Sequence, residues 1–431
     1  MSGTILFLIA LVLSIFLGVK FKINIGMIAL TFAFLIGCFY LNLGASAVFA
    51  MWPSKLFVTL LFVMCFFAFA VTNGSLDKLA QFVTWKFRKT PALIPFALFF
   101  LIFALSAGGM STYAMFAFMA PIVLSIAQKV NMHRVMVACV VIGGSVSGGM
   151  TPISQLGVTH LNTLTNIGYS VEESATILNT MFINNFIGEF GMFLVCYFLF
   201  KTYKIKVDES SKPEPFTVTQ KKTLWLFGLG ITTILIPALL HTFVPTNALY
   251  TKLYNSLDIT LIALIGIIVC IFLKIGDFKD ALAKVPMSSL ILVSGISVLI
   301  SVGVKAGAVE QLSAWAGENI SGAAAPFFMV VVSAVFSLFA AATSIVVPTM
   351  GTLIPGLVAA NMAFTPGYLF SLSNTSAILT GYSPFSSGGS ITMSGVFDEK
   401  ERDMLFKWLL IFPAMSTVFC LILTALGLVI N

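Results

Sequence analysis

Two stretches decide the fold of this chain: Gly149-Met-Thr151-Pro152-Ile-Ser154-Gln155 and Gly381-Tyr-Ser383-Pro384-Phe-Ser386-Ser387. Each places a proline inside a long apolar segment, just after a glycine and a hydroxyl residue. Proline removes a backbone donor and clashes with the preceding helical turn, whereas glycine permits unusual dihedral angles. We therefore predict that a helix is interrupted at each stretch. They are called the first break (residues 149–155) and the second break (residues 381–387).

The two breaks end two related repeats. Four landmarks recur in the same order and at similar spacings. In the first repeat they are Pro53, Gly74, Pro121 and Pro152, with successive spacings of 21, 47 and 31 positions. In the second repeat they are Pro286, Gly307, Pro355 and Pro384, with successive spacings of 21, 48 and 29 positions. Repeats that contain interrupted helices are typical of secondary transporters, whose binding site lies at the repeat interface. The pattern therefore predicts a transporter.

Composition excludes a soluble enzyme. Apolar residues make up 59% of the 431 positions and charged residues only 9%, whereas soluble domains are about a quarter charged. The six cysteines and three histidines are dispersed, so neither a disulfide framework nor a metal site is predicted. With no catalytic constellation at matched depth, we expect a multi-pass membrane protein that is not an enzyme and needs no cofactor beyond a coupling ion.

The basic residues give a topology. All but Lys55, Lys252 and Lys305 fall into six clusters, which begin near residues 20, 78, 129, 201, 274 and 400. Cytoplasmic connections carry an excess of Lys and Arg, so the six clusters are predicted to be cytoplasmic and nucleic-acid binding is not expected. Under this constraint the first repeat starts outside and the second inside, which predicts that the repeats are inverted and that both termini lie on the outer side.

We therefore expect an all-α polytopic membrane protein with about ten transmembrane spans and two re-entrant hairpins, at residues 91–128 and 324–362, in an inverted-repeat architecture. Residues 73–90 mix Asp77, Lys78 and basic residues with apolar ones, which predicts an amphipathic helix at the cytoplasmic interface. The predicted units are N-terminal spans (1–52), a first repeat (53–200), a cytoplasmic linker (201–222), connecting spans (223–285) and a second repeat (286–431).

The hairpin tips and breaks supply the candidate ligands. Unwound helices free carbonyls for a cation, and half-helix N-termini present N–H groups to an anion. The predicted substrate-binding residues are Ser111, Thr112, Thr151, Pro152, Ser154, Gln155, Thr343, Ser344, Ser383, Pro384, Ser386 and Ser387. The predicted cation-binding residues are Gly109, Ser111, Gly149, Thr151, Thr343, Gly381 and Ser383.

The same segments lack basic residues, which bears on the class of transport. No Lys or Arg occurs in 90–128, 135–200 or 306–399, so an anion held there would need a co-bound cation for charge balance. This favours cation-coupled symport of a small organic anion. Glu189 is an acidic residue deep in an apolar segment and is a candidate for proton coupling. A cation/proton antiporter and a non-transporting membrane subunit remain alternatives.

The chain resembles a known superfamily in these features. Paired hairpins, each followed by a Thr-Pro or Ser-Pro break, resemble the ion transporter superfamily, including the divalent anion/sodium symporters. The stretch from Trp52-Pro53-Ser-Lys-Leu-Phe57 to Asn73-Gly74-Ser-Leu-Asp77 resembles the N-terminal region of the MatC-type malonate/dicarboxylate carriers. The resemblance implies Na⁺- or H⁺-coupled symport of a C3 or C4 dicarboxylate. It also implies a homodimer in the inner membrane whose transport domain moves as an elevator against a scaffold.

Overall fold

The regular structure is helical throughout the part of the chain that the computed structural model describes. That part comprises residues 3–21, 23–110, 112–152, 154–207, 212–244, 247–285, 287–308, 311, 324–338, 342–360, 363–396 and 398–431. In these residues no strand occurs. The all-α prediction is therefore confirmed.

The first half of the chain forms α1 to α11. Their bounds are α1 (Gly3–Phe21), α2 (Ile25–Phe34), α3 (Ala45–Phe49), α4 (Ser54–Thr72), α5 (Ser75–Lys86), α6 (Ile94–Ala107), α7 (Thr112–Lys129), α8 (Arg134–Ala138), α9 (Gly144–Gly149), α10 (Gln155–Ile167) and α11 (Val171–Leu199). Short π-helical turns, Leu35–Tyr40 and Cys139–Gly143, follow α2 and join α8 to α9.

The second half forms the remaining helices. They are α12 (Val218–Phe243), α13 (Ala248–Ser256), α14 (Ile259–Phe272), α15 (Phe278–Ala283), α16 (Met287–Lys305), α18 (Ala325–Ser337), the π-helical turn η6 (Ala342–Val346), α19 (Val347–Gly351), α20 (Ile354–Ala360), α21 (Pro366–Thr380), α22 (Ser387–Ser394) and α23 (Glu399–Ala425). Helix α12 begins at Val218, inside the predicted linker 201–222.

Several helices are long and apolar enough to cross a membrane. Among the described residues, α7, α11, α12 and α23 meet this condition, and the number rises to six if each of two bent pairs counts as one span. The pairs are α4 with α5 and α13 with α14, and seven further apolar helices have 10–17 residues. These lengths fit a multi-pass membrane protein. The more detailed count of about ten spans stays a prediction.

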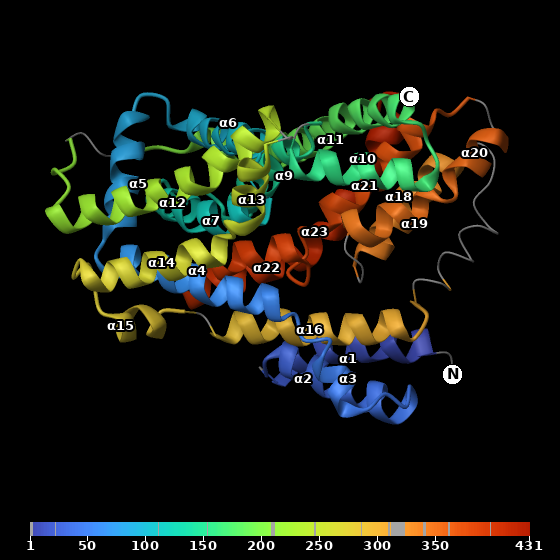
Figure 1. Cartoon of the computed structure of the whole chain (residues 1–431), viewed down its shortest axis with the longest axis horizontal. Helices are drawn as coiled ribbons and strands as arrows, with labels where there is room; N and C mark the ends of the chain where they lie inside the picture. Colours follow the sequence, from blue (N-terminus) through green and yellow to red (C-terminus); the bar gives the residue numbers. More distant parts are fainter. Residues whose placement is uncertain are drawn as a thin grey trace.

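The junction of α4 and α5 shows how the sequence sets a sharp turn. Gly74 adopts φ +72°, a left-handed conformation that favours glycine, and the two helix axes then differ by 71°. Asn73 Oδ1 accepts a hydrogen bond from the Ser75 N–H at 3.0 Å and so caps the start of α5. Figure 1 shows α5 standing across the end of the molecule. The predicted helix is confirmed, and its place at a membrane interface stays a prediction.

Glycines bring α2 and α16 into backbone contact. A Cβ at Gly26 would lie 2.3 Å from the Ile291 carbonyl oxygen, and one at Gly295 would lie 2.0 Å from the Gly26 carbonyl oxygen. Neither position can hold a larger residue without separating the helices. Helices α1, α2 and α16 therefore form a closely packed group, which lies at the lower right of Figure 1.

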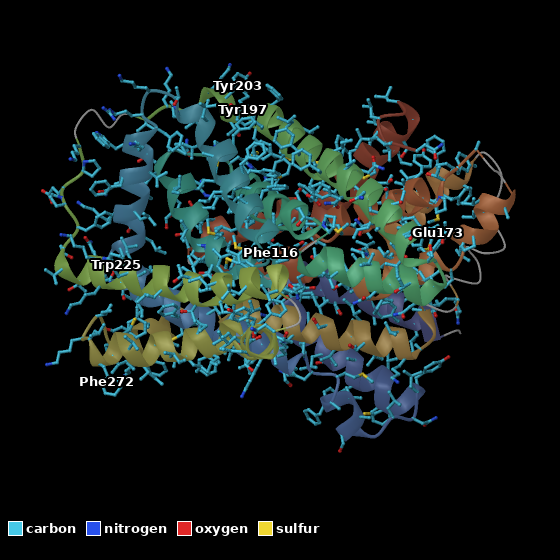
Figure 2. All side chains as sticks on the ribbon, turned by 45° about the horizontal axis from the view of Figure 1, so that its top comes forward. Phe116, Glu173, Tyr197, Tyr203, Trp225 and Phe272 are labelled. Atoms are coloured by element: carbon cyan, nitrogen blue, oxygen red, sulfur yellow. The ribbon has the colours of Figure 1, made fainter. Side chains whose placement is uncertain are left out.

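The other long helices surround the two breaks. Helices α4, α12 and α14 pack against one another and extend to the left in Figure 1, and α6 to α11 and α18 to α21 occupy the upper part. Trp225 on α12 and Phe272 on α14 are 73% and 80% exposed, and Figure 2 shows both on the outside of the molecule. Large exposed apolar side chains of this kind suit a helix surface that faces lipid.

Each hairpin contacts both repeats. The first arms, α6 and α18, pack closely on α9 and α21, the half-helices that precede the breaks of their own repeats. The returning arms pack on the half-helices that follow the breaks of the other repeat: α7 on α22, and η6 with α19 on α10. The two repeats are therefore interleaved through their hairpins.

Candidate functional site

The two breaks have corresponding backbone structures. Helix α9 ends at Gly149 and α10 begins at Gln155, whereas α21 ends at Thr380 and α22 begins at Ser387. Ser154 and Ser386 occupy the N-cap positions of α10 and α22, each with an extended backbone. The prediction that both helices are interrupted at the Thr-Pro and Ser-Pro steps is therefore confirmed.

The two N-cap serines contact backbone carbonyls of their breaks in the same way. The Ser154 hydroxyl donates to the Gly149 carbonyl and contacts the Thr151 carbonyl oxygen at 2.8 Å. The Ser386 hydroxyl donates to the Gly381 carbonyl and contacts the Ser383 carbonyl oxygen at 2.8 Å. In both breaks the serine therefore satisfies carbonyls that the helix interruption leaves without their usual partner.

A glycine three residues after each serine lets the two half-helices approach. A Cβ at Gly157 would lie 2.1 Å from the Thr151 carbonyl oxygen. A Cβ at Gly389 would lie 2.2 Å from the Ser383 carbonyl oxygen. Since the obstructing atoms are backbone atoms, a side chain at either position would force the break apart.

Each hairpin is also fastened to its own broken helix by a serine. The Ser106 hydroxyl, near the end of α6, donates to the Ser145 carbonyl oxygen at 2.7 Å. The Ser337 hydroxyl, at the end of α18, donates to the Ala377 carbonyl oxygen at 2.6 Å. Both serines are buried. These two equivalent bonds hold the hairpin arms beside the half-helices that precede the breaks.

Polar atoms gather where the first hairpin meets the first break. A Cβ at Gly149 would lie 2.7 Å from Thr112 Oγ1, at the start of α7. Thr112 Oγ1 and Gln155 Oε1 are buried and have no hydrogen-bond partner among the described residues. Buried polar atoms are normally paired, so these two oxygens are candidate ligand atoms. Hydroxyl and amide oxygens are ligands that hard cations accept.

A cavity of about 740 Å³ adjoins the first hairpin and the first break. It is lined by Gly109, Tyr113 and Gln155, from the first hairpin and the first break, together with Ile391 of α22. It is also lined by the start of α4, by Ile234 and Pro237 of α12, and by the connection from α13 to α14. Its volume lies within the usual range for small-molecule sites, roughly 300–1,000 Å³.

At the second break a tyrosine bonds to one oxygen of a buried carboxylate, whose other oxygen, Glu189 Oε1, has no hydrogen-bond partner among the described residues. The Tyr382 hydroxyl donates to Glu189 Oε2 of α11 at 2.6 Å, and the Tyr382 ring stacks on Phe412 with centroids 4.5 Å apart. A Cβ at Gly143 would lie 3.0 Å from the Tyr382 hydroxyl oxygen, so the first repeat also contacts this pair. Glu189 is fully buried and does not line the cavity described above.

The structure distributes the predicted site residues unequally. Gly109 and Gln155 line the cavity, whereas Thr112 and Gly149 lie close to each other and are not among the described residues that line it. Thr151 and Ser154 bond to carbonyls of their own break, as Ser386 does at the second, and Ser383 accepts from the Phe385 N–H. Pro152 is exposed, Pro384 is buried, and Thr343 lies in η6 beside α10. Ser111 lies outside the described residues, as do the side chains of Ser344 and Ser387.

Two charged residues of the cavity escape sequence reasoning. Lys55 Nζ, on the second residue of α4, lies 3.8 Å from Asp258 Oδ2, and both residues line the cavity. The charge pattern only shows that Lys55 stands apart from the six basic clusters. The missed signal is that a lone basic residue occurs at the very start of an apolar segment, two residues after Pro53.

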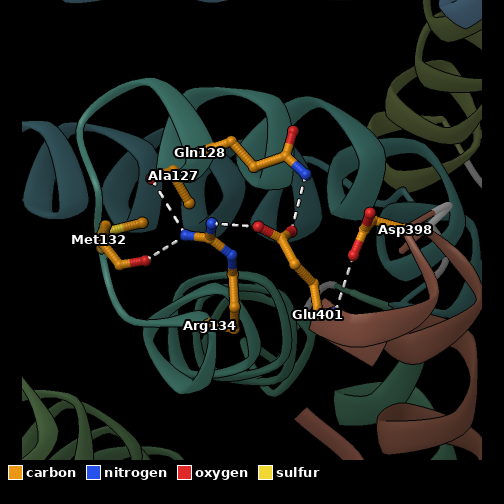
Figure 3. Close-up of polar contacts among 6 residues, drawn as sticks. All are labelled: Ala127, Gln128, Met132, Arg134, Asp398 and Glu401. Carbon is orange, nitrogen blue, oxygen red and sulfur yellow. Dashed lines mark hydrogen bonds and ion pairs between the residues drawn. The ribbon is translucent and has the colours of Figure 1, made fainter. Parts of the chain in front are cut away.

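A separate polar cluster ties α23 to the first repeat. Arg134, buried at the start of α8, donates to the Met132 carbonyl oxygen and to Glu401 Oε1 of α23, both at 2.5 Å (Figure 3). Gln128 Nε2 donates to the other Glu401 oxygen at 2.7 Å. Burial, with Arg134 beside it, lowers the pKa of His133 to about 4, so its ring is neutral where it stacks on Phe200.

The comparisons with known proteins agree with the resemblance seen in the sequence. No curated protein matches the chain. Residues 1–149 match the family model described as the dicarboxylate carrier protein MatC N-terminus. The matched segment runs from α1 to the end of α9 and therefore includes the first hairpin and the start of the first break. This part of the chain is thus similar to the N-terminal part of the MatC dicarboxylate carriers.

Proposed function

We propose that this protein is a secondary transporter that carries a small dicarboxylate of the C3 or C4 class together with a cation. The observation that carries the proposal is the 740 Å³ cavity, which the first hairpin and first break share with α4, α12 and α14. The match of residues 1–149 to the dicarboxylate carrier family supports the substrate class.

The first break offers separate partners for anion and cation. Gln155 begins α10, and no side chain caps that helix, so its N-terminal end directs a partial positive charge at the cavity. The unpartnered oxygens of Thr112 and Gln155 belong to the first hairpin and the first break. We propose that a Na⁺ ion travels with the substrate at these oxygens and balances the charge of one carboxylate.

The interleaved hairpins support alternating access by an elevator mechanism. The hairpins and broken helices pack on one another, and the cavity opens between the first hairpin and α4, α12 and α14, beside the places where α7 packs on α4 and Gly109 approaches α12. We propose that the hairpins and broken helices form a transport domain and that α4, α12, α14 and the group of α1, α2 and α16 form the scaffold. In this arrangement the protein is a homodimer in the inner membrane with both termini outside.

The first test is the thermal stability of the detergent-purified protein with malonate, succinate, acetate and butyrate, each with Na⁺ or with choline. A ligand that binds the folded state raises stability by mass action. We expect a higher melting temperature with a dicarboxylate only when Na⁺ is present, and saturable Na⁺-dependent uptake into proteoliposomes. Stabilisation by a dicarboxylate without Na⁺ but only at acidic pH would assign the coupling to protons. Absence of any shift and of any uptake would contradict the proposal.

A further inference from the structure

Lys55 occupies a position that its own helix does not explain. It is the second residue of α4, where the helix dipole presents partial positive charge, so a cation there is unfavourable for helix stability. Pro53 precedes the helix, and no side chain caps it. The Lys55 side chain is 89% exposed and therefore contributes little to packing. A structural role thus accounts poorly for a lysine at this site.

Asp258, the partner of Lys55, is by contrast held in place. It is the N-cap residue of α14, and its Oδ1 accepts a hydrogen bond from the Thr260 N–H at 2.8 Å. The starts of α4 and α14 are joined by a bond between the Thr59 and Thr260 hydroxyls at 2.7 Å. Two helix N-termini and one lysine therefore converge on this side of the cavity. Asp258 supplies the opposing negative charge.

The ion pair is weak enough to be exchanged. Its Nζ–Oδ2 separation of 3.8 Å is near the limit for an ion pair, and the Asp258 side chain is 43% exposed. Pairs of this kind contribute little to stability. A carboxylate that enters the cavity can replace Asp258 as the partner of Lys55 with little loss to the protein. Of the residues that line the cavity, Lys55 is the basic one and Asp258 the acidic one.

We propose that Lys55 is a specificity-determining residue that captures one carboxylate of the substrate, and that Asp258 holds Lys55 ready when the cavity is empty. This inference rests on the proposed function. The second carboxylate then faces Gln155 of the first break, which lines the same cavity. An anion with two carboxylates can engage Lys55 and the first break at once, whereas a monocarboxylate engages one of them. Lys55 therefore favours dicarboxylates.

The test is uptake of malonate and succinate into proteoliposomes by the wild type and by Lys55→Gln, Lys55→Arg and Asp258→Asn. Lys252→Gln is the matched control, because Lys252 is an exposed lysine of α13 that does not line the cavity. Asp258→Asn keeps an N-cap residue of similar quality, so α14 is retained. The readouts are KM, kcat and the dependence of KM on choline chloride at constant Na⁺.

We expect Lys55→Gln to raise KM about two- to fivefold with little change in kcat, as the loss of an exposed charge pair predicts. Its KM should also lose the salt dependence that the wild type shows, because added salt screens an exposed charge. Lys55→Arg should restore both properties, and Asp258→Asn should lower KM. A Lys55→Gln variant with the KM and salt dependence of Lys252→Gln would overturn the inference. Absence of saturable uptake by the wild type would overturn the proposed function as well.

Discussion

The two breaks share one backbone plan but differ in what surrounds them. In both, a serine bonds to the carbonyl five residues earlier and a glycine lets the half-helices meet. At the first break, oxygens of Thr112 and Gln155 have no partner in the described part of the chain, and a cavity adjoins them. At the second, Tyr382 bonds to Glu189 and stacks on Phe412.

This difference shows that the two repeats share the backbone structure of the break but not the side chains that surround it. The backbone of each break depends on a few small residues, which both repeats retain. The polar side chains around it differ between the two breaks, because the backbone of the break does not itself depend on them. Under the proposed function the first break serves ligands, whereas the second is joined to α11 by the bond between Tyr382 and Glu189.

Replacing the glycines should have the largest effect and tests whether the breaks are equivalent. We expect Gly157→Ala and Gly389→Ala each to lower stability by about 1–3 kcal/mol or more, the usual cost of overpacking. A Cβ at either position would meet a backbone carbonyl within 2.2 Å. Thermal unfolding in detergent measures the effect.

Gly228→Ala is the control for these glycine variants, because a Cβ at that position in α12 meets nothing within 4 Å. It should cost no stability, since alanine favours a helix over glycine. If only one of the two break variants were destabilised, the breaks would not share a backbone plan.

A second pair of variants tests the difference between the breaks. Tyr382→Phe leaves a buried Glu189 oxygen without its donor and should cost about 1–3 kcal/mol. Thr112→Val removes a hydroxyl that has no partner in the described part, so its stability should be equal to or above that of the wild type. Na⁺-dependent uptake should nevertheless fall sharply in Thr112→Val.

The readouts for this pair are the melting temperature and uptake at several Na⁺ concentrations. The Thr112→Val variant should need more Na⁺ to reach half-maximal uptake, whereas Tyr382→Phe should keep the wild-type dependence on Na⁺. The assignment of ligand binding to the first break fails if Thr112→Val keeps the wild-type dependence on Na⁺ and Tyr382→Phe needs more Na⁺ for half-maximal uptake.

The smallest expected effect concerns the serines of the hairpin arms. Ser106→Ala and Ser337→Ala each remove one buried hydrogen bond to a backbone carbonyl. Each should lower stability by about 1 kcal/mol, the usual net value of such a bond. Equal shifts in the melting temperature would support the equivalence of the hairpins. A shift in one variant alone would show that one hairpin is held by other contacts.

Much of the fold could be predicted from local chemistry. The Thr151-Pro152 and Ser383-Pro384 steps mark the breaks because a proline there stands among glycines and hydroxyl residues, whereas Pro121, Pro237 and Pro413 lie inside continuous helices. Gly74 marks the bend between α4 and α5 because its φ of +72° favours glycine. These features depend on residues adjacent in the chain, so the sequence contains them directly.

The cavity could be predicted only in part. Gly109 and Gln155 belong to predicted motifs, but Lys55 and Asp258 are about 200 positions apart and meet only because α4 packs on α14. Tyr382 is an ordinary aromatic residue in an apolar chain until the fold brings it to Glu189. Contacts between distant helices carry no local signal, and a single sequence does not reveal them.

The interleaving of the hairpins has a consequence for synthesis at the ribosome. The returning arm of the first hairpin, α7, ends at Lys129, but it packs on α22, which begins at Ser387. More than 250 residues must therefore be translated after α7 before its packing partner exists. The first repeat must wait in the membrane with one face of α7 uncovered, and the final assembly of the core follows the synthesis of the last helices.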